Sequence, residues 1–114
     1  FIQYTYARIR SVLRRCEEAG MAHLDYSAVV PNEKEIALIQ RLADFPEVVA
    51  EAGRNYSPAL IANYCYDLVK EYNQFQLREE DRAICSLRMA ISDATAKTIK
   101  KSMALLGINV PERM

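Results

Sequence analysis

The chain has 114 residues, 51% of them hydrophobic, and its fifteen basic side chains are balanced by fifteen acidic ones. Zero net charge argues against a general nucleic-acid binder, and no apolar run approaches the roughly 20 residues of a membrane span, so we expect no membrane partner. We expect residues 1–114 to form one domain with a real hydrophobic core. Three widely spaced cysteines favour a reducing, cytoplasmic location. Because the chain opens with Phe1 inside a helical pattern, we interpret it as an excised C-terminal domain of a longer protein.

The first ten residues, FIQYTYARIR, combine three aromatic rings with two arginines and contain no acid. Aromatic rings stack on bases and arginines neutralise phosphates, so this mixture suits a surface that meets single-stranded nucleic acid. The same residues would also suit an ordinary bundle helix with its rings in the core and its arginines in solvent. This stretch alone leaves both interpretations open.

Charge is unevenly distributed along the chain. Residues 1–15 carry a net charge of +4, residues 16–81 a net charge of −8 and residues 82–114 a net charge of +4. If the two ends lie side by side, they form a basic face on a neutral protein. Arg14 and Arg15 have no base-reading neighbour in the sequence, so we assign them to phosphate contacts. The alternative is a chance asymmetry on a solvated surface.

Hydrophobic periodicity predicts a first helix over residues 1–19, ended by Gly20. Asn32 and Glu35 have the spacing of a capping box, which predicts the start of a second helix over residues 33–43. The expected buried faces are Ile2, Ile9, Val12, Leu13 and Cys16 in the first helix, and Ile36, Ile39 and Leu42 in the second.

A short third helix is predicted over residues 46–52, ended by Gly53. Ser57 as a cap and Pro58 at the first helical position predict a fourth helix that runs to about residue 75. A fifth is predicted from residue 79 or 80 to residue 106. Their expected buried residues are Val49 and Ala52 in the third, Ile61, Tyr64, Cys65, Leu68, Tyr72 and Phe75 in the fourth, and Ile84, Leu87, Ile91, Ala94, Thr98 and Met103 in the fifth. The sequence therefore predicts an all-α fold, a helical bundle of four long helices and one short helix.

The sequence contains no recognisable catalytic motif. It has no Ser–His–Asp set, no glycine-rich phosphate loop and no HExxH motif. The single histidine, His23, has no cluster of metal ligands around it, so neither a catalytic residue nor a metal site is expected. We therefore expect this chain on its own to be non-catalytic.

Three stretches of the sequence carry a family resemblance. The opening FIQYTYAR resembles the Q-Y-x-x-A-R signature that begins the C-terminal domain of arginyl-tRNA synthetases. The ending LLGINVPERM resembles the terminus of the same enzymes, and LRMA, residues 87–90, resembles the D-A-L-R-type element that names their anticodon-binding domain. Together these stretches extend the resemblance over the whole chain.

This resemblance implies a helical domain appended to a class I catalytic domain, with which ATP and Mg would be associated. This domain would hold no cofactor itself and would bind the anticodon loop of arginine tRNA, positioning the tRNA for arginylation elsewhere in the enzyme. We also expect a monomer. The candidate tRNA-binding residues, from the resemblance and the charge pattern together, are Phe1, Tyr4, Tyr6, Arg8, Arg14, Arg15, Lys100 and Met114.

The chain departs from the family pattern in two places. Tyr6 stands where the family often has histidine. The family continues its fourth helix into an aromatic-containing stretch, whereas residues 75–78 here lead straight to acidic residues.

Two alternatives remain open: the corresponding domain of a sister enzyme such as the cysteinyl one, and a helical protein-interaction module without an RNA ligand.

Overall fold

The computed structural model describes residues 2–18, 31–74 and 82–107. In these ranges the chain forms five helices and no strand, which confirms the all-α prediction. None of the helices is long and apolar enough to cross a membrane. The helices, in chain order, are α1 (Ile2–Glu18), α2 (Glu33–Ala43), α3 (Phe45–Arg54), α4 (Pro58–Asn73) and α5 (Arg82–Leu105).

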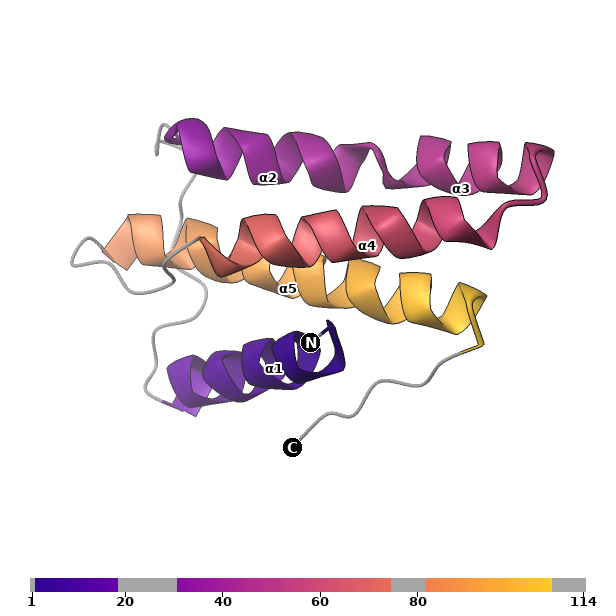
Figure 1. The fold of residues 1–114 in the computed structure, drawn as a ribbon. Helices are drawn as coiled ribbons and strands as arrows, with labels where there is room; N and C mark the ends of the chain where they lie inside the picture. Colours follow the sequence, from indigo (N-terminus) through magenta and orange to yellow (C-terminus); the bar gives the residue numbers. More distant parts are fainter. Residues whose placement is uncertain (1, 19–30, 75–81, 108–114) are drawn as a thin grey trace.

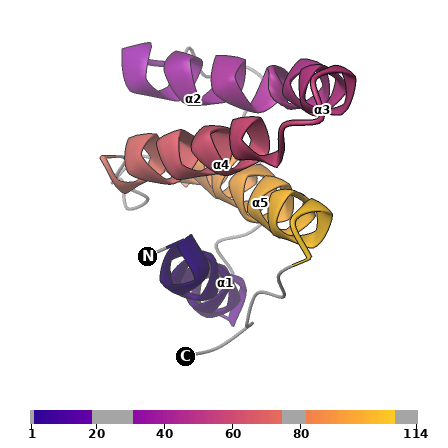
Figure 2. The same cartoon turned by 45° about the vertical axis from the view of Figure 1, so that its right-hand side comes forward.

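The central helices of the bundle are α4 and α5, which pack against each other (Figure 1). On one side, α2 and α3 follow one another along α4, and α2 also reaches α5. On the opposite side, α1 packs mainly against α5 and also contacts α4, as the turned view confirms (Figure 2). The bundle encloses a core with members from α1, α2, α4 and α5, among them Ile9, Leu38, Cys65, Leu68, Val69 and Ile99.

The sequence predicted capping residues at the starts of α2 and α4, and the structure confirms the first fully and the second in part. The predicted capping box of α2 is present: the Glu35 amide donates to Asn32 Oδ1 and the Asn32 amide donates to Glu35 Oε1, each at 2.8 Å. α4 begins at Pro58 as predicted. Ser57 has the extended backbone of a cap, but its side chain makes no capping hydrogen bond, so that part of the prediction is wrong.

The end of α3 was also predicted incorrectly, because the helix continues through Gly53 to Arg54. It closes in a Schellman motif, in which the Ser57 amide donates to Ala52 O at 2.9 Å and the Tyr56 amide to Gly53 O at 3.4 Å. The left-handed position of this motif, usually glycine, is Tyr56, with φ of 50°. Its side chain is 94% exposed.

The buried face of α2 differs from the predicted one. Ile36 and Ile39 are 42% and 40% exposed, whereas Leu38 and Glu35 are buried. The Arg88 guanidinium on α5 donates to the Glu35 carboxylate at 3.0 Å, which accounts for a charged residue on the inner side of α2. In α5, two buried hydroxyls donate to helix carbonyls, Thr95 to Ile91 O and Ser102 to Thr98 O, which satisfies these polar groups inside the bundle.

Candidate nucleic-acid interface

The outward face of α1 carries a row of polar and aromatic side chains. Tyr4, Arg8, Ser11 and Arg15 follow one another at helical spacings of four, three and four residues. Tyr4 is 57% exposed, and Arg8 and Arg15 are also exposed. A shallow pocket of about 180 Å³ is lined by Tyr4, Ala7, Arg8 and Ser11. We call the four residues of this row, Tyr4, Arg8, Ser11 and Arg15, the α1 stripe.

Arg8 connects the α1 stripe to the C-terminal end of α4. Its guanidinium donates to Asn73 Oδ1 at 2.5 Å, across 65 positions of sequence. Asn73 is neutral and exposed, so this contact orients the guanidinium without cancelling its charge. Sequence reasoning missed Asn73, because nothing in its local surroundings indicates a partner on the first helix.

Arg10 lies on the other side of α1 and faces α5. Its guanidinium is 2.8 Å from the Asp93 carboxylate, which also lies 2.9 Å from the Lys97 ammonium. Burial acts to raise the pKa of Asp93, but the hydrogen bonds from Lys97 and Arg10 outweigh it and hold that pKa below its ordinary value. Arg10 therefore fastens α1 to α5, and its guanidinium is engaged by a carboxylate that it shares with Lys97.

The predicted basic face shared by the first and fifth helices is only partly found. α1 and α5 do pack together, but Arg8 turns toward α4. Arg14 is half-buried and donates to Ser11 Oγ at 3.1 Å. Lys100 is exposed on α5, three residues after Lys97. The contacts that the structure gives for Arg8 therefore join the α1 stripe to α4 rather than to α5.

Tyr6 does not fit the expected role of an RNA contact. Its side chain is only 3% exposed and belongs to the hydrophobic core, so a base could not stack on its ring without unpacking α1. The helical period explains this, since Tyr6 lies between Ile2 and Ile9 on the inner face. The other two candidates, Phe1 and Met114, lie outside the described residues, as does the short connection at residues 75–78.

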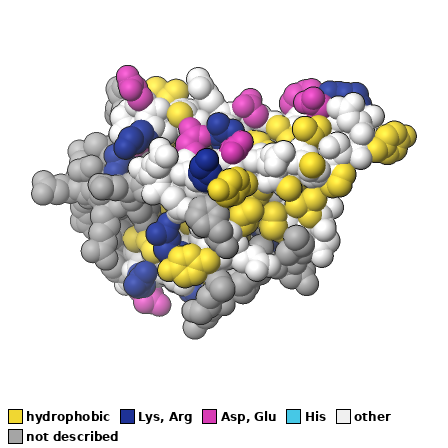
Figure 3. Space-filling view, viewed as in Figure 1, with side chains coloured by type: hydrophobic (Ala, Val, Ile, Leu, Met, Phe, Trp, Pro, Cys, Tyr) yellow, Lys and Arg dark blue, Asp and Glu magenta, His cyan; other side chains and the backbone are white. Residues whose placement is uncertain are grey.

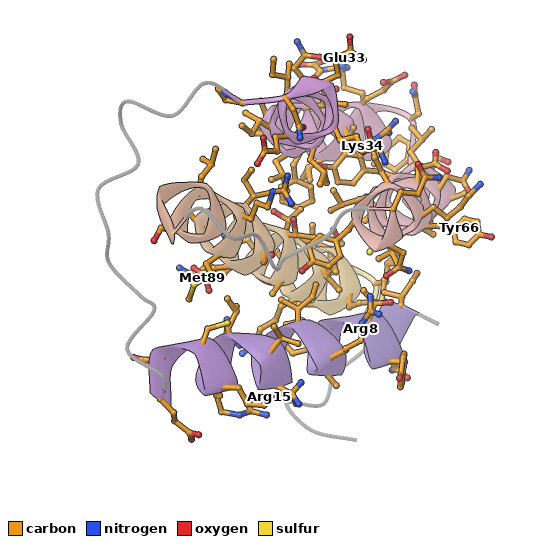
Figure 4. The ribbon with its side chains drawn as sticks, turned by 90° about the vertical axis from the view of Figure 1, so that its left-hand side faces the viewer. Arg8, Arg15, Glu33, Lys34, Tyr66 and Met89 are labelled. Atoms are coloured by element: carbon orange, nitrogen blue, oxygen red, sulfur yellow. The ribbon has the colours of Figure 1, made fainter. Side chains whose placement is uncertain are left out.

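Arg88, in the LRMA stretch, is a structural residue. Its side chain is 11% exposed and its partner Glu35 is 2% exposed, so the ion pair is largely withdrawn from water. Because Glu35 also closes the capping box of α2, one carboxylate ties the start of α2 to α5. Figure 4 shows the neighbouring Met89 on the side of the molecule away from Arg8. This stretch thus holds the bundle together and is not part of the α1 stripe.

Comparison with known proteins decides the family. The model of the DALR anticodon binding domain matches residues 2–114. The chain belongs to the DALR anticodon binding domain family. It is 56% identical to an arginine–tRNA ligase of Porphyromonas gingivalis and 49% identical to one of Flavobacterium psychrophilum, over 100% of the chain in both cases. These alignments cover 20% and 19% of the relatives, so the chain spans about a fifth of their length.

A solved structure agrees with this assignment. The DALR domain formed by this chain is similar to part of the arginyl-tRNA synthetase of Thermus thermophilus, with a TM-score of 0.84 and 30% sequence identity. The similarity covers 99% of this chain and 20% of that one. The resemblance deduced from the two ends of the sequence and from LRMA is therefore confirmed, and with it the helical bundle.

Proposed function

We propose that this chain binds the anticodon loop of an arginine tRNA through the α1 stripe, as one part of an arginine–tRNA ligase. The observation that carries the proposal is the exposed stripe itself, which presents the Tyr4 ring one helical turn from the Arg8 guanidinium. An exposed ring can stack on an unpaired base, and a guanidinium whose partner is a neutral amide can still neutralise a phosphate.

In this proposal the chemistry of arginylation lies in another part of the longer protein, which would hold ATP and Mg. The DALR domain would contribute no catalytic residue. It would position the tRNA so that the acceptor end reaches the active site. A monomeric, cytoplasmic enzyme remains our expectation from the sequence.

The test is a binding titration of the chain with the anticodon stem-loop of an arginine tRNA, with a stem-loop of mismatched anticodon beside it. We expect preferential binding of the arginine stem-loop. Tyr4→Ala should weaken binding by about 5- to 150-fold, the range expected for one stacked base. Tyr56→Asn serves as the control, because Tyr56 is also exposed but lies at the α3–α4 turn.

Equal affinity for the two stem-loops, or loss of affinity only in the Tyr56 variant, would contradict the proposal. Absence of any RNA binding would favour the protein-interaction alternative.

A further inference from the structure

A second exposed aromatic ring lies beside a cation on α4. Tyr66 is 47% exposed, and the Lys70 ammonium lies 5.4 Å from the centre of its ring. The two residues are one helical turn apart, and Asn73, the partner of Arg8, comes next on the same face. We call Tyr66, Lys70 and Asn73 the α4 stripe.

Two of the exposed tyrosines are followed, four residues later, by a basic side chain, and the third is not. Among the aromatic side chains that the structure describes, the exposed ones are Tyr4, Tyr56 and Tyr66. Tyr4 and Tyr66 each precede a cation by four residues, Arg8 and Lys70. The others have structural contacts: the Tyr64 hydroxyl donates to Arg41 O, the Tyr72 hydroxyl donates to Ser92 Oγ, Tyr6 belongs to the core, and the partly buried Phe45 packs against it. A ring exposed beside a cation thus occurs on both α1 and α4.

The two stripes lie on one side of the molecule. The hydrogen bond from Arg8 to Asn73 joins them directly. Tyr66 is about 10 Å from Asn73 along the axis of α4, and Tyr4 about 6 Å from Arg8 along α1. Tyr66 projects on the same side as Arg8 (Figure 4). The face seen in Figure 3 carries hydrophobic side chains next to basic ones over both α4 and α1, with acidic side chains close by in the upper part of the view.

Two acids of α4 stand next to the α4 stripe in the sequence, Asp67 after Tyr66 and Glu71 after Lys70. Glu71 forms an ion pair with Arg41 of α2, and the Asp67 charge acts on the same guanidinium. Arg41 therefore offsets the Glu71 carboxylate at the contact between α2 and α4. The α4 stripe itself contains no acid, so its charge is positive and continues that of Arg8.

We propose that Tyr66 and Lys70 form a second binding unit for unpaired nucleotides, which extends the RNA-binding surface from α1 onto α4. Tyr66 stacks a base on the face of its ring opposite the ammonium, and Lys70 contacts the adjoining phosphate. This inference rests on the proposed function, because the nucleotides would belong to the same anticodon loop, and it adds residues that the α1 stripe does not include.

The first test measures binding of the arginine anticodon stem-loop to Tyr66→Ala and Lys70→Gln. Tyr66→Ala should lose about 5- to 150-fold in affinity. Lys70→Gln should reduce the slope of log affinity against log salt by about 0.7 to 0.9, the value for one phosphate contact. The matched controls are Tyr56→Asn and Arg54→Gln at the end of α3, where Arg54 pairs with Glu47 in exposed surroundings, and these should leave both quantities unchanged.

The second test does not depend on the loss of a side chain. The chain contains no tryptophan, so a Tyr66→Trp variant has a single indole reporter at the proposed site. Its fluorescence should be quenched by the stem-loop, and that of Tyr56→Trp should not change.

The outcomes separate the two proposals. If the parent chain binds the stem-loop and Tyr4→Ala weakens binding, but the Tyr66 and Lys70 variants behave like the controls, the α4 unit is wrong and the proposed function stands. If the parent chain does not bind the stem-loop, both are overturned. Quenching at position 66 together with weaker binding of Tyr66→Ala supports the α4 unit.

Discussion

Arg88 and Arg8 both reach across the bundle to a side chain on another helix, but their partners give them opposite roles. Arg88 meets a carboxylate, Glu35, and both side chains are almost out of water. Arg8 meets an amide, Asn73, and stays exposed. The charge of the first arginine is balanced inside the protein, whereas the second is held in place with its charge still available. The residue type is the same, so it is the partner that decides between scaffold and binding surface.

The largest expected effect concerns the buried pair. Arg88→Met removes the partner of a carboxylate that is 2% exposed, and leaving a buried charge unpaired costs about 3–5 kcal/mol. Urea unfolding monitored by circular dichroism should show this as a lower midpoint. Because α1 and its partners are not altered, any chain that remains folded should bind the stem-loop with unchanged affinity.

Two further variants sharpen this result. Glu35→Gln combined with Arg88→Met should recover much of the lost stability, since glutamine removes the charge and can still take part in the capping box. Arg54→Met breaks the exposed pair with Glu47 and should change the free energy of unfolding by less than about 1 kcal/mol. If Arg88→Met were as mild as Arg54→Met, the scaffold role of Arg88 would be wrong.

Features of the fold that depend on residues close together in the sequence could be predicted, and features that depend on distant residues could not. The capping box of α2 and Pro58 at the start of α4 involve neighbouring residues, and both were located correctly. The buried face of α2 was missed because Ile36 and Ile39 are more hydrophobic than Glu35. The reason for burying Glu35 lies 53 residues away, at Arg88.

The candidate binding surface shows the same limit. Tyr4 and Arg8 were selected from their local pattern and the family resemblance, and the structure finds both exposed. Tyr6 was selected on the same grounds but packs in the core. The hydrogen bond from Arg8 to Asn73 could not be predicted, because it joins residues that are 65 positions apart in the sequence.

A smaller effect would distinguish available charge from balanced charge on α1. Arg8→Gln should reduce the slope of log affinity against log salt by about 0.7 to 0.9, because one phosphate contact is lost. Arg10→Gln should leave this slope unchanged, because the Arg10 guanidinium faces α5 and is engaged by Asp93. Arg15→Gln, at the exposed end of the α1 stripe, should behave like Arg8→Gln. Equal slopes for all three variants would contradict this prediction, because Arg10 would then contribute to RNA binding as much as Arg8 and Arg15 do.

The smallest expected effect is the pH dependence of the contact that fastens α1 to α5. Burial acts to raise the pKa of Asp93, but the hydrogen bonds from Lys97 and Arg10 lower it by more than burial raises it. The folded-state pKa of Asp93 therefore lies below the unfolded value of about 3.9. A lowered pKa means that the contact contributes fully above the unfolded pKa and is lost as the pH falls through the folded one. With side chains 31% and 38% exposed for Arg10 and Asp93, the contribution should be about 0.2–1 kcal/mol.

The measurement is the difference in free energy of unfolding between the parent chain and Asp93→Asn, at neutral pH and in acid. Asparagine cannot ionise, so this difference isolates the charged form of Asp93 from every other carboxylate that protonates in the same range. The parent chain should be the more stable at neutral pH, and its advantage should disappear below the folded-state pKa. Nuclear magnetic resonance titration of the Asp93 carboxyl carbon should give a pKa below the ordinary value, and a higher one in Arg10→Gln. An advantage that persists unchanged in acid would mean that packing, and not the shared ion pair, holds this side of α1 in place.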